Sequence, residues 1–364
     1  MFHPISKKLI QWYGHNKRTL PWRDVADPYC IWISEIILQQ TRVSQGTDYY
    51  LRFVNRFPNV IELAGAHQDE VLKYWQGLGY YSRARNLHQT AKVIVEKFNG
   101  EFPHTHAEIL SLKGIGEYTA AAICSFAYNM PYAVVDGNVY RVISRVFGID
   151  TPIDSAVGKK EFAITAQQLL NKMDAGTHNQ AIMEFGALHC VPVKPDCLNC
   201  TLKSYCKAYE LELTDTLPIK QSKIKVRTRF FNYLFIRCQS NVYMRQRNEN
   251  DVWQQLYEFP LIESDRLFDV SDVFQSKYLM GQTGVSLNSA VHDFKHILSH
   301  QRIFARFFSI EIQEPYIQCD DCFSIDIDAI HQYPISRLME LFLEKVNSRS
   351  EHVSKASKSR KDIE

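Results

Sequence analysis

The chain has 364 residues, with 42 basic and 40 acidic side chains, a formal net charge of +2, 45% hydrophobic residues and 23% charged residues. This composition excludes a collagen-like repeat, a wholly disordered chain and a small disulfide-rich protein, and the length favours two or three domains. No apolar run reaches the roughly 18 residues of a membrane-spanning helix, and the first residues lack the pattern of a secretory signal. We therefore expect a globular protein of the cytosol, without a membrane partner.

Residues 1–208 are predicted to form an all-α domain. Apolar residues recur there at three-to-four spacing, which is typical of amphipathic helices, in the stretches 29–40, 68–76, 84–98, 119–128 and 160–172. Glycine and proline residues separate these stretches and indicate the loops between the helices.

The second half is predicted to be an α+β domain spanning residues 230–345. Aromatic and β-branched residues, which favour strands, are concentrated in segments 230–238, 241–247 and 297–312. The polar segment 209–229 is expected to be a linker. The tail 346–364 lacks apolar periodicity and is expected to be disordered.

Four of the nine cysteines lie in the short loop 190–206, namely Cys190, Cys197, Cys200 and Cys206. Four thiolates can complete the tetrahedral shell of zinc or hold an iron–sulfur cluster. Zinc sites usually combine two Cys-x2-Cys pairs, and this loop contains one, so the spacing favours a cluster. Because the protein would fill every ligand position, we expect a structural or DNA-docking loop rather than a catalytic centre.

A second Cys-x2-Cys pair, Cys319 and Cys322, stands apart from the loop. It has no partner cysteines nearby, so we interpret it as two ordinary cysteines.

Two glycines, Gly114 and Gly116, directly precede an apolar helix within the segment 112–122. Glycines at such a position let backbone N–H groups approach an anion at the start of the helix. The pattern indicates a helix-hairpin-helix motif that grips a DNA phosphate without reading sequence. The same pattern also occurs in simple tight turns.

Two acidic residues have sequence surroundings that suit a role in acid–base chemistry. Glu35 lies in an apolar helix, where burial would raise the pKa of its carboxyl group. If Glu35 instead lies on the solvated face of that helix, its pKa would keep its usual value. Asp136 precedes an amphipathic helix, which it would cap and whose dipole would keep it ionised. A protonated and an ionised carboxyl group together suit cleavage of a glycosidic bond through an oxocarbenium-like state.

The order of the motifs resembles that of the MutY-type adenine DNA glycosylases, which belong to the helix-hairpin-helix superfamily together with endonuclease III. The resemblance covers residues 1–208 through PWR (21–23), SEIILQQT (34–41), GLGYYSR (77–83), LKGIGEYTAAA (112–122), VVDGNVYRV (134–142), NQAIMEFGALHC (179–190) and the cysteine loop. The second half resembles the family's MutT-like, Nudix-related domain through VWQQLYEFP (252–260) and LSHQR (298–302).

The resemblance implies hydrolysis of the bond between adenine and deoxyribose where adenine is mispaired with 8-oxoguanine or guanine in double-stranded DNA. Glu35 would protonate adenine at N7, Asp136 would stabilise the sugar cation, and Tyr118 and Asn138 would support both. Trp22, Arg23 and Glu184 would line the adenine pocket. Residues Gln40, Thr41, Leu78 and Tyr80 would enter the base stack, and Ser299 and His300 would contact 8-oxoguanine.

The resemblance also implies that the four cysteines of the loop hold one [4Fe-4S] cluster and that Gly114 and Gly116 contact the DNA backbone. It further implies a monomer of the bacterial cytoplasm that associates with the nucleoid when it is bound to DNA. One departure from the family is Leu298, where an aromatic residue is usual. An aliphatic side chain cannot stack as an aromatic one does, so the details of lesion contact stay open, while polar readout by His300 does not depend on this position.

Three other functions compete with this interpretation. An endonuclease III-like lyase needs a lysine nucleophile after the hairpin glycines, where this chain has Tyr118. A non-catalytic damage-binding protein would have lost a carboxylate, and both are present. A nucleotide hydrolase in the second half would need a glutamate-rich helix for Mg²⁺, but residues 258–285 contain only Glu258 and Glu263.

Overall fold

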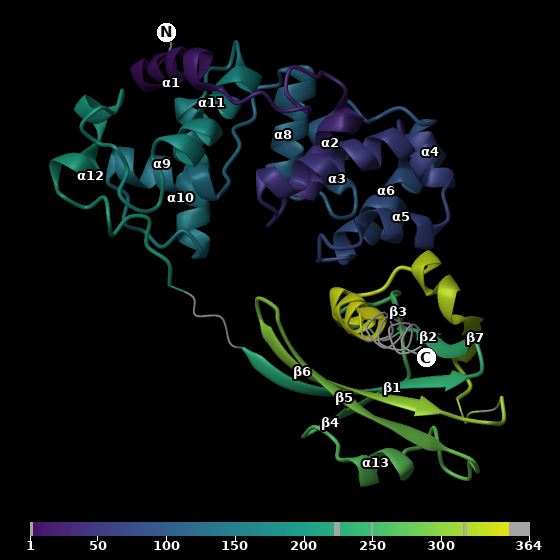
Figure 1. Cartoon of the computed structure of the whole chain (residues 1–364). Coiled ribbons are helices and arrows are strands. Elements are labelled where there is room, and N and C mark those ends of the chain that lie inside the picture. Colours follow the sequence, from purple (N-terminus) through teal and green to yellow (C-terminus); the bar gives the residue numbers. More distant parts are fainter. Residues whose placement is uncertain (1–2, 222–225, 249, 316, 318, 349–364) are drawn as a thin grey trace, which may run out of the picture. The chain divides into compact units, whose positions relative to one another are not determined.

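The computed structural model describes residues 3–221, 226–248, 250–315, 317 and 319–348. The chain divides into two compact units, which are described separately (Figure 1). The first unit comprises residues 1–66 and 85–223, and the second comprises residues 67–84 and 224–364. None of the helices in the described part combines the length and the apolar character needed to cross a bilayer.

The first unit is helical, which confirms the all-α prediction. Its helices are α1 (Pro4–Asn16), α2 (Pro28–Leu38), α3 (Val43–Arg56), α4 (Val60–Gly65), most of α6 (Ser82–Phe98), α7 (His106–Ser111), α8 (Glu117–Tyr128), α9 (Gly137–Phe147), α10 (Ala156–Leu169), α11 (Ala175–Leu188), η1 (Lys203–Tyr205) and α12 (Lys207–Glu210). Proline begins α1 and α2, where its missing N–H costs no hydrogen bond.

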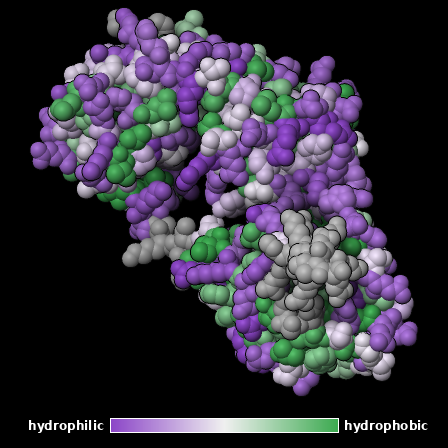
Figure 2. All heavy atoms as spheres, viewed as in Figure 1, coloured by the Kyte–Doolittle hydropathy of each residue, from purple (hydrophilic) through white to green (hydrophobic). Residues whose placement is uncertain are grey.

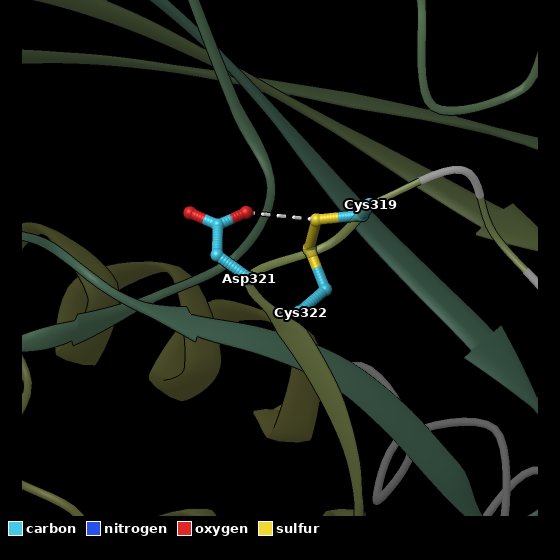
Figure 3. Close-up of side chains that lie close together, drawn as sticks. All are labelled: Cys319, Asp321 and Cys322. Carbon is cyan, nitrogen blue, oxygen red and sulfur yellow. Dashed lines mark hydrogen bonds between the residues drawn. A yellow bond between two sulfur atoms is a disulfide. The ribbon is translucent and has the colours of Figure 1, made fainter.

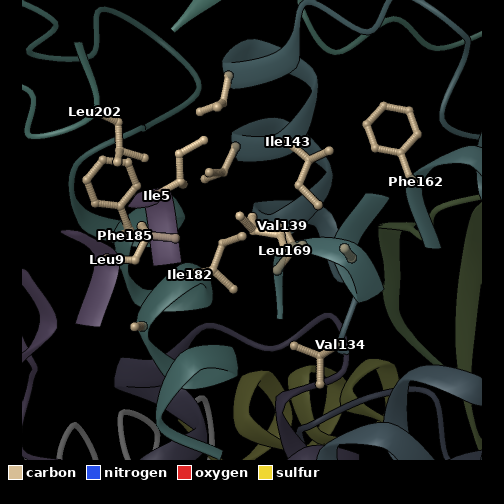
Figure 4. Packing of buried hydrophobic residues seen from close by; sticks show 14 of the residues in the cluster. Ile5, Leu9, Val134, Val139, Ile143, Phe162, Leu169, Ile182, Phe185 and Leu202 are labelled. Carbon is tan, nitrogen blue, oxygen red and sulfur yellow. The ribbon is translucent and has the colours of Figure 1, made fainter. Parts of the chain in front are cut away.

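Helix α9 lies at the centre of a hydrophobic core in the first unit. Its residues Val139, Val142, Ile143 and Val146 are buried at the spacing of one helix face. They pack with Leu9 of α1, Phe162 of α10, Phe185 of α11 and Leu202 of the cysteine loop, several of which are labelled in Figure 4. This packing fixes α9, and therefore the position of Asp136 at its start.

The second unit is built on a mixed seven-stranded sheet. Its strands are β1 (Arg227–Cys238), β2 (Asn241–Gln246), β3 (Tyr257–Glu258), β4 (Leu261–Ser264), β5 (Ser286–Ile297), β6 (Gln301–Glu311) and β7 (Cys322–Asp326). The order is β3-β2-β1-β6-β5, with β4 paired to β1 and β7 to β2. Strands β1 and β6 are parallel, whereas β5 and β6 form an antiparallel pair. The unit also contains α5 (Gln68–Trp75), α13 (Val270–Phe274), η2 (Ile327–Gln332) and a helical segment at 337–348.

Some boundaries differ from those expected from the sequence. Strand β1 begins at Arg227 and so includes the last residues of the predicted linker 209–229. The tail was expected to be disordered from residue 346, but residues 346–348 are helical, and the rest of the tail lies outside the described residues.

The segment 67–84 groups with the sheet rather than with the remainder of 1–208. Its polar side chains explain this, since the hydroxyl of Tyr257 donates to Asp69 at 2.8 Å and Lys73 Nζ donates to the carbonyl of Tyr333 at 3.1 Å.

We expect Ile143→Ala to destabilise the first unit by about 2–5 kcal/mol, because it leaves a cavity in a fully buried core. The matched variant Ile164→Ala removes an isoleucine that is 48% exposed on α10, and its cost should stay within about 0.5 kcal/mol. Chemical denaturation followed by tryptophan fluorescence compares the two. Equal destabilisation would contradict the central position of α9.

Candidate active site

A cavity of about 410 Å³ opens among α2, α8, α9 and α11 in the first unit. A cavity of this volume can hold a small ligand. Its lining includes many of the residues that the sequence singled out, namely Trp22, Arg23, Glu35, Gln40, Thr41, Tyr118, Asp136, Asn138 and Glu184. Residues from distant parts of the chain therefore meet at one site.

Glu35 lies on α2 among the buried residues Ile31, Trp32 and Ile36, and it is only 6% exposed. Burial raises the pKa of its carboxyl group to about 7, although a hydrogen bond from Tyr118 partly opposes the shift. The Tyr118 hydroxyl donates to Oε2 of Glu35 at 2.6 Å. Glu35 can therefore hold a proton near neutral pH.

Asp136 caps the N-terminus of α9. Its Oδ1 accepts from the backbone N–H of Val139 at 2.8 Å, and its Oδ2 accepts from Asn138 Nδ2 at 2.9 Å. Burial raises the pKa of Asp136 above its usual value, while these hydrogen bonds and the charge of Arg141 act in the opposite direction. The net shift of the pKa of Asp136 is upward, so the hydrogen bonds at the start of α9 oppose the effect of burial without cancelling it.

Glu184 is held by two arginines. Its Oε1 accepts from the backbone N–H of Arg18 at 2.9 Å and from Arg18 Nε at 2.9 Å. Its Oε2 accepts from Arg18 Nη2 at 2.6 Å and from Arg23 Nη2 at 2.7 Å. Burial favours the neutral acid, but the hydrogen bonds from Arg18 and Arg23 lower the pKa of Glu184 to about 2. Both oxygens are thus engaged by protein donors.

Sequence reasoning missed several residues that line the cavity, including Arg18, Gln180 and Met183. Gln180 and Glu184 are four positions apart on α11, and residues at this spacing share one helix face. That spacing could have identified Gln180. Its Oε1 accepts from the hydroxyl of Tyr13 at 2.5 Å.

The two hairpin glycines lie between α7 and α8, where a helix-hairpin-helix motif was predicted. Gly114 has a positive φ of 82°, and a Cβ placed there would come within 2.9 Å of Asn86 Cβ. Glycine is therefore required for this turn. Gly116 is the N-cap of α8 and is exposed, so the start of α8 is open to an anion.

The four remaining predicted residues, Leu78, Tyr80, Ser299 and His300, belong to the second unit. Leu78 is buried, whereas Tyr80, Ser299 and His300 are exposed. Ser299 and His300 lie in the tight turn between β5 and β6, and the Tyr80 hydroxyl donates to Ser299 Oγ at 3.1 Å. Two segments far apart in the sequence thus present adjacent polar groups.

All four cysteines of the loop line one cavity in the first unit, which fits a single ligand set. Four free thiols of one loop can hold one zinc ion or an iron–sulfur cluster.

Helix α9 connects the cavity to the cysteine loop through two arginines. Arg141 donates to Asn138 Oδ1 at 2.9 Å and to the carbonyl of Cys190 at 2.7 Å. Arg145 is buried and donates to the carbonyls of Val191, at 2.8 Å, and Pro192, at 3.0 Å. Both arginines fix the start of the loop against the helix that carries Asp136.

Two family models match the chain. The HhH-GPD superfamily of base excision DNA repair proteins matches residues 33–167, and the NUDIX domain matches residues 232–345. A thermostable thymine-DNA glycosylase of known structure superposes with a TM-score of 0.53 and 29% identity, covering 57% of this chain and 95% of the other. An endonuclease III–DNA complex shares the fold, with a TM-score of 0.50, 21% identity and the same coverage.

Two relatives extend the comparison along the sequence. The adenine DNA glycosylase of Mus musculus is 43% identical over 216 residues, which are 57% of this chain and 42% of that protein. The adenine DNA glycosylase of Buchnera aphidicola subsp. Baizongia pistaciae is 36% identical over 299 residues, covering 81% of this chain and 83% of that protein. The chain therefore belongs to the adenine DNA glycosylase family, MutY-type enzymes of base excision repair with a helix-hairpin-helix domain and a Nudix-like C-terminal domain.

Proposed function

We propose that the enzyme removes adenine mispaired with 8-oxoguanine or guanine in double-stranded DNA. The observation that carries the proposal is the presence of Glu35 and Asp136 on one cavity, the first with a pKa of about 7 and the second oriented by two residues of α9. Adenine must leave the helix to reach them, and extrusion costs a few kcal/mol, less for a mispaired base.

Glu35 is the general acid in this proposal. Because Tyr118 donates to Oε2, a protonated Glu35 carries its proton on Oε1, which is free to donate it to N7 of adenine. Protonation turns adenine into a better leaving group. As the glycosidic bond breaks, the Asp136 carboxylate stabilises the positive charge that develops on the sugar, and water then completes hydrolysis.

The base itself is bound between Trp22 and polar groups of the cavity. Nη1 of Arg23 is buried and, among the described residues, has no hydrogen-bond partner. An acceptor nitrogen of the extruded adenine would satisfy it. Since both oxygens of Glu184 are engaged by Arg18 and Arg23, Glu184 acts by orienting Arg23, and Gln180 is the better candidate for direct contact with the base.

Lesion recognition is assigned to the turn between β5 and β6. Ser299 and His300 are exposed polar residues at the tip of a hairpin, and Tyr80 donates to Ser299. In the proposal Ser299 and His300 read 8-oxoguanine on the opposite strand, while Gly114 and Gly116 contact the DNA backbone. Gln40, Thr41, Leu78 and Tyr80 enter the base stack.

The cysteine loop is proposed to hold one [4Fe-4S] cluster through Cys190, Cys197, Cys200 and Cys206. The cluster would supply iron–thiolate bonds that close the loop. Arg141 and Arg145 already tie the loop to α9 through backbone carbonyls, so the loop and Asp136 share a support. Iron and sulfide analysis of the purified protein tests this assignment.

The competing functions receive no support from the geometry. Tyr118 occupies the position where a lyase would need lysine, so the enzyme acts as a monofunctional glycosylase. Glu258 is buried and paired with Arg245 and Arg247, and Glu263 is paired with Arg229. These glutamates are therefore engaged by arginine, which opposes Mg²⁺-dependent nucleotide hydrolysis in the second unit.

The deciding experiment uses a duplex with one 8-oxoguanine:adenine pair, followed by alkali. We expect strand scission at the adenine only, and slower or no scission in a matched duplex with thymine:adenine. Scission without alkali, or covalent trapping by borohydride, would favour a lyase. Equal cleavage of both duplexes would disprove mispair specificity.

Glu35→Gln should lower the rate of adenine release about 10²–10⁴-fold, because the amide has no proton to donate, while binding to the mispair persists. In the unaltered enzyme, activity should fall as pH rises through about 7, where Glu35 loses its proton. Single-turnover kinetics across pH measure both effects. Glu101→Gln, on an exposed loop residue, is the matched control, and normal turnover by the Glu35→Gln variant would disprove the acid role.

The acidic limb of the same pH profile is expected to follow protonation of Asp136. Asn138→Ala should shift this limb upward by roughly one pH unit. Asn138 donates to the ionised form of Asp136, and losing one charge-assisted hydrogen bond raises the pKa of the carboxyl by about that amount. Asn16→Ala, on the exposed end of α1, serves as the control. An unmoved acidic limb would show that Asn138 does not tune Asp136.

His300→Ala should reduce the preference for adenine opposite 8-oxoguanine over adenine opposite guanine by about tenfold, the loss expected of one hydrogen bond to a base edge. His331→Ala removes another exposed histidine of the same unit and should leave the ratio unchanged. Comparing kcat/KM on the two duplexes measures the preference. An unaltered ratio in the His300 variant would remove this residue from lesion recognition.

A further inference from the structure

Three metal-ligating groups meet at the entrance to β7, in the second unit and outside the proposed active site. The sulfurs of Cys319 and Cys322 and a carboxylate oxygen of Asp321 lie within 4.8 Å of one another (Figure 3). The two cysteines are joined as a disulfide. Their interpretation as ordinary, unrelated cysteines was therefore wrong, because a turn brings their side chains together.

The turn itself holds the three groups in place. The backbone N–H of Cys322 donates to the carbonyl of Cys319 at 3.4 Å, and Cys322 begins β7, which pairs with β2. Apolar parts of both cysteines pack against a buried cluster that includes Ile310 and Ile317. One face of the pair is thus anchored in the core.

Asp321 is oriented by the protein. Its Oδ2 accepts from Arg245 Nη1 at 3.1 Å, and its Oδ1 lies 3.2 Å from Cys319 Sγ. Arg245 is itself bound to the buried Glu258 at 3.2 Å. A carboxylate whose second oxygen is fixed by a hydrogen bond has the support that metal-binding carboxylates usually have.

The site is also accessible. The Asp321 side chain is 49% exposed, so an ion can enter from solvent without a rearrangement of the core. Two thiolates favour a soft or borderline divalent cation, and a carboxylate adds a third ligand that zinc accepts. Three protein ligands leave a fourth position for water.

We propose that, when the pair is reduced, Cys319, Asp321 and Cys322 bind a divalent cation of the zinc class. Binding replaces two thiol protons: the two S–H groups and M²⁺ give two S–M bonds and release two protons. The disulfide is the metal-free form, because its sulfurs are bonded to each other and cannot act as thiolate ligands. A thiol reductant converts the disulfide into this form: it supplies two electrons and two protons, becomes a disulfide itself, and leaves the two thiols that bind the cation.

The test uses the full-length protein as purified, reduced and kept under anaerobic conditions, with Co²⁺ as a visible substitute for zinc. The unaltered chain should bind about one equivalent of cobalt more than a Cys319→Ser/Cys322→Ser variant binds. A near-ultraviolet thiolate-to-cobalt band should appear in the difference spectrum. Cys238→Ala, which removes a separate free cysteine of the same unit, should retain both signals.

Two further comparisons identify the ligands. Asp321→Asn should weaken cobalt binding about tenfold or more, whereas Asp320→Asn, on the adjacent exposed residue, should bind as the unaltered chain does. Equal binding by both variants would overturn the three-ligand site.

A measurement on the unaltered protein tests the proposal even if the double serine variant misfolds. Diamide takes two protons and two electrons from the two thiols, becomes a hydrazine and leaves a disulfide. The oxidised protein should lose the cobalt band, and a reductant should restore it. A band that survives oxidation, or that persists in the double serine variant, would overturn the proposal.

Discussion

The active-site geometry depends on one unfavourable arrangement, the burial of a carboxyl group in the apolar helix α2. Glu35 is itself buried in a helix whose other buried residues include Ile31, Trp32 and Ile36, and a carboxylate without water is costly unless cations surround it. The protein supplies a tyrosine hydroxyl instead. The pKa of Glu35 rises to about 7 as a result, and the acid role proposed for this residue depends on that shift.

Other buried glutamates in the same chain show how specific this arrangement is. Glu184 is also buried, yet Arg18 and Arg23 donate to both of its oxygens and lower its pKa to about 2. Glu258 in the second unit is paired with Arg245 and Arg247, yet burial still raises the pKa of its carboxyl group. Burial alone therefore does not decide the charge of a carboxyl group in this protein. Guanidinium donors hold Glu184 as a carboxylate, whereas Glu35 accepts a hydrogen bond from the neutral hydroxyl of Tyr118.

Helix α9 has a second role besides carrying Asp136. Its buried face organises the core of the first unit, and its polar face joins the cavity to the cysteine loop through Arg141 and Arg145. The position of the carboxylate thus depends on both apolar packing and the loop. A change in the loop can alter the position of Asp136, because Arg141 donates to Asn138 and Asn138 in turn donates to Asp136.

Local patterns in the sequence were sufficient for the elements and for the two carboxylates. The spacing of Val139, Val142, Ile143 and Val146 predicts α9, Asp136 is recognisable as its cap, and the apolar neighbours of Glu35 indicate its raised pKa, because all of these depend on residues close in the chain. The partners of Glu184 could not be assigned in this way, since Arg18 precedes Glu184 by 166 positions and reaches it only in the folded chain. The raised pKa of Asp136 could not be predicted from the sequence either, because it results from burial under distant segments. The pairing of Cys319 with Cys322 also could not be predicted, because it needs the turn before β7. Sequence periodicity reports which face of an element is apolar, but only tertiary packing decides which charges and thiols lie within a few ångströms of one another.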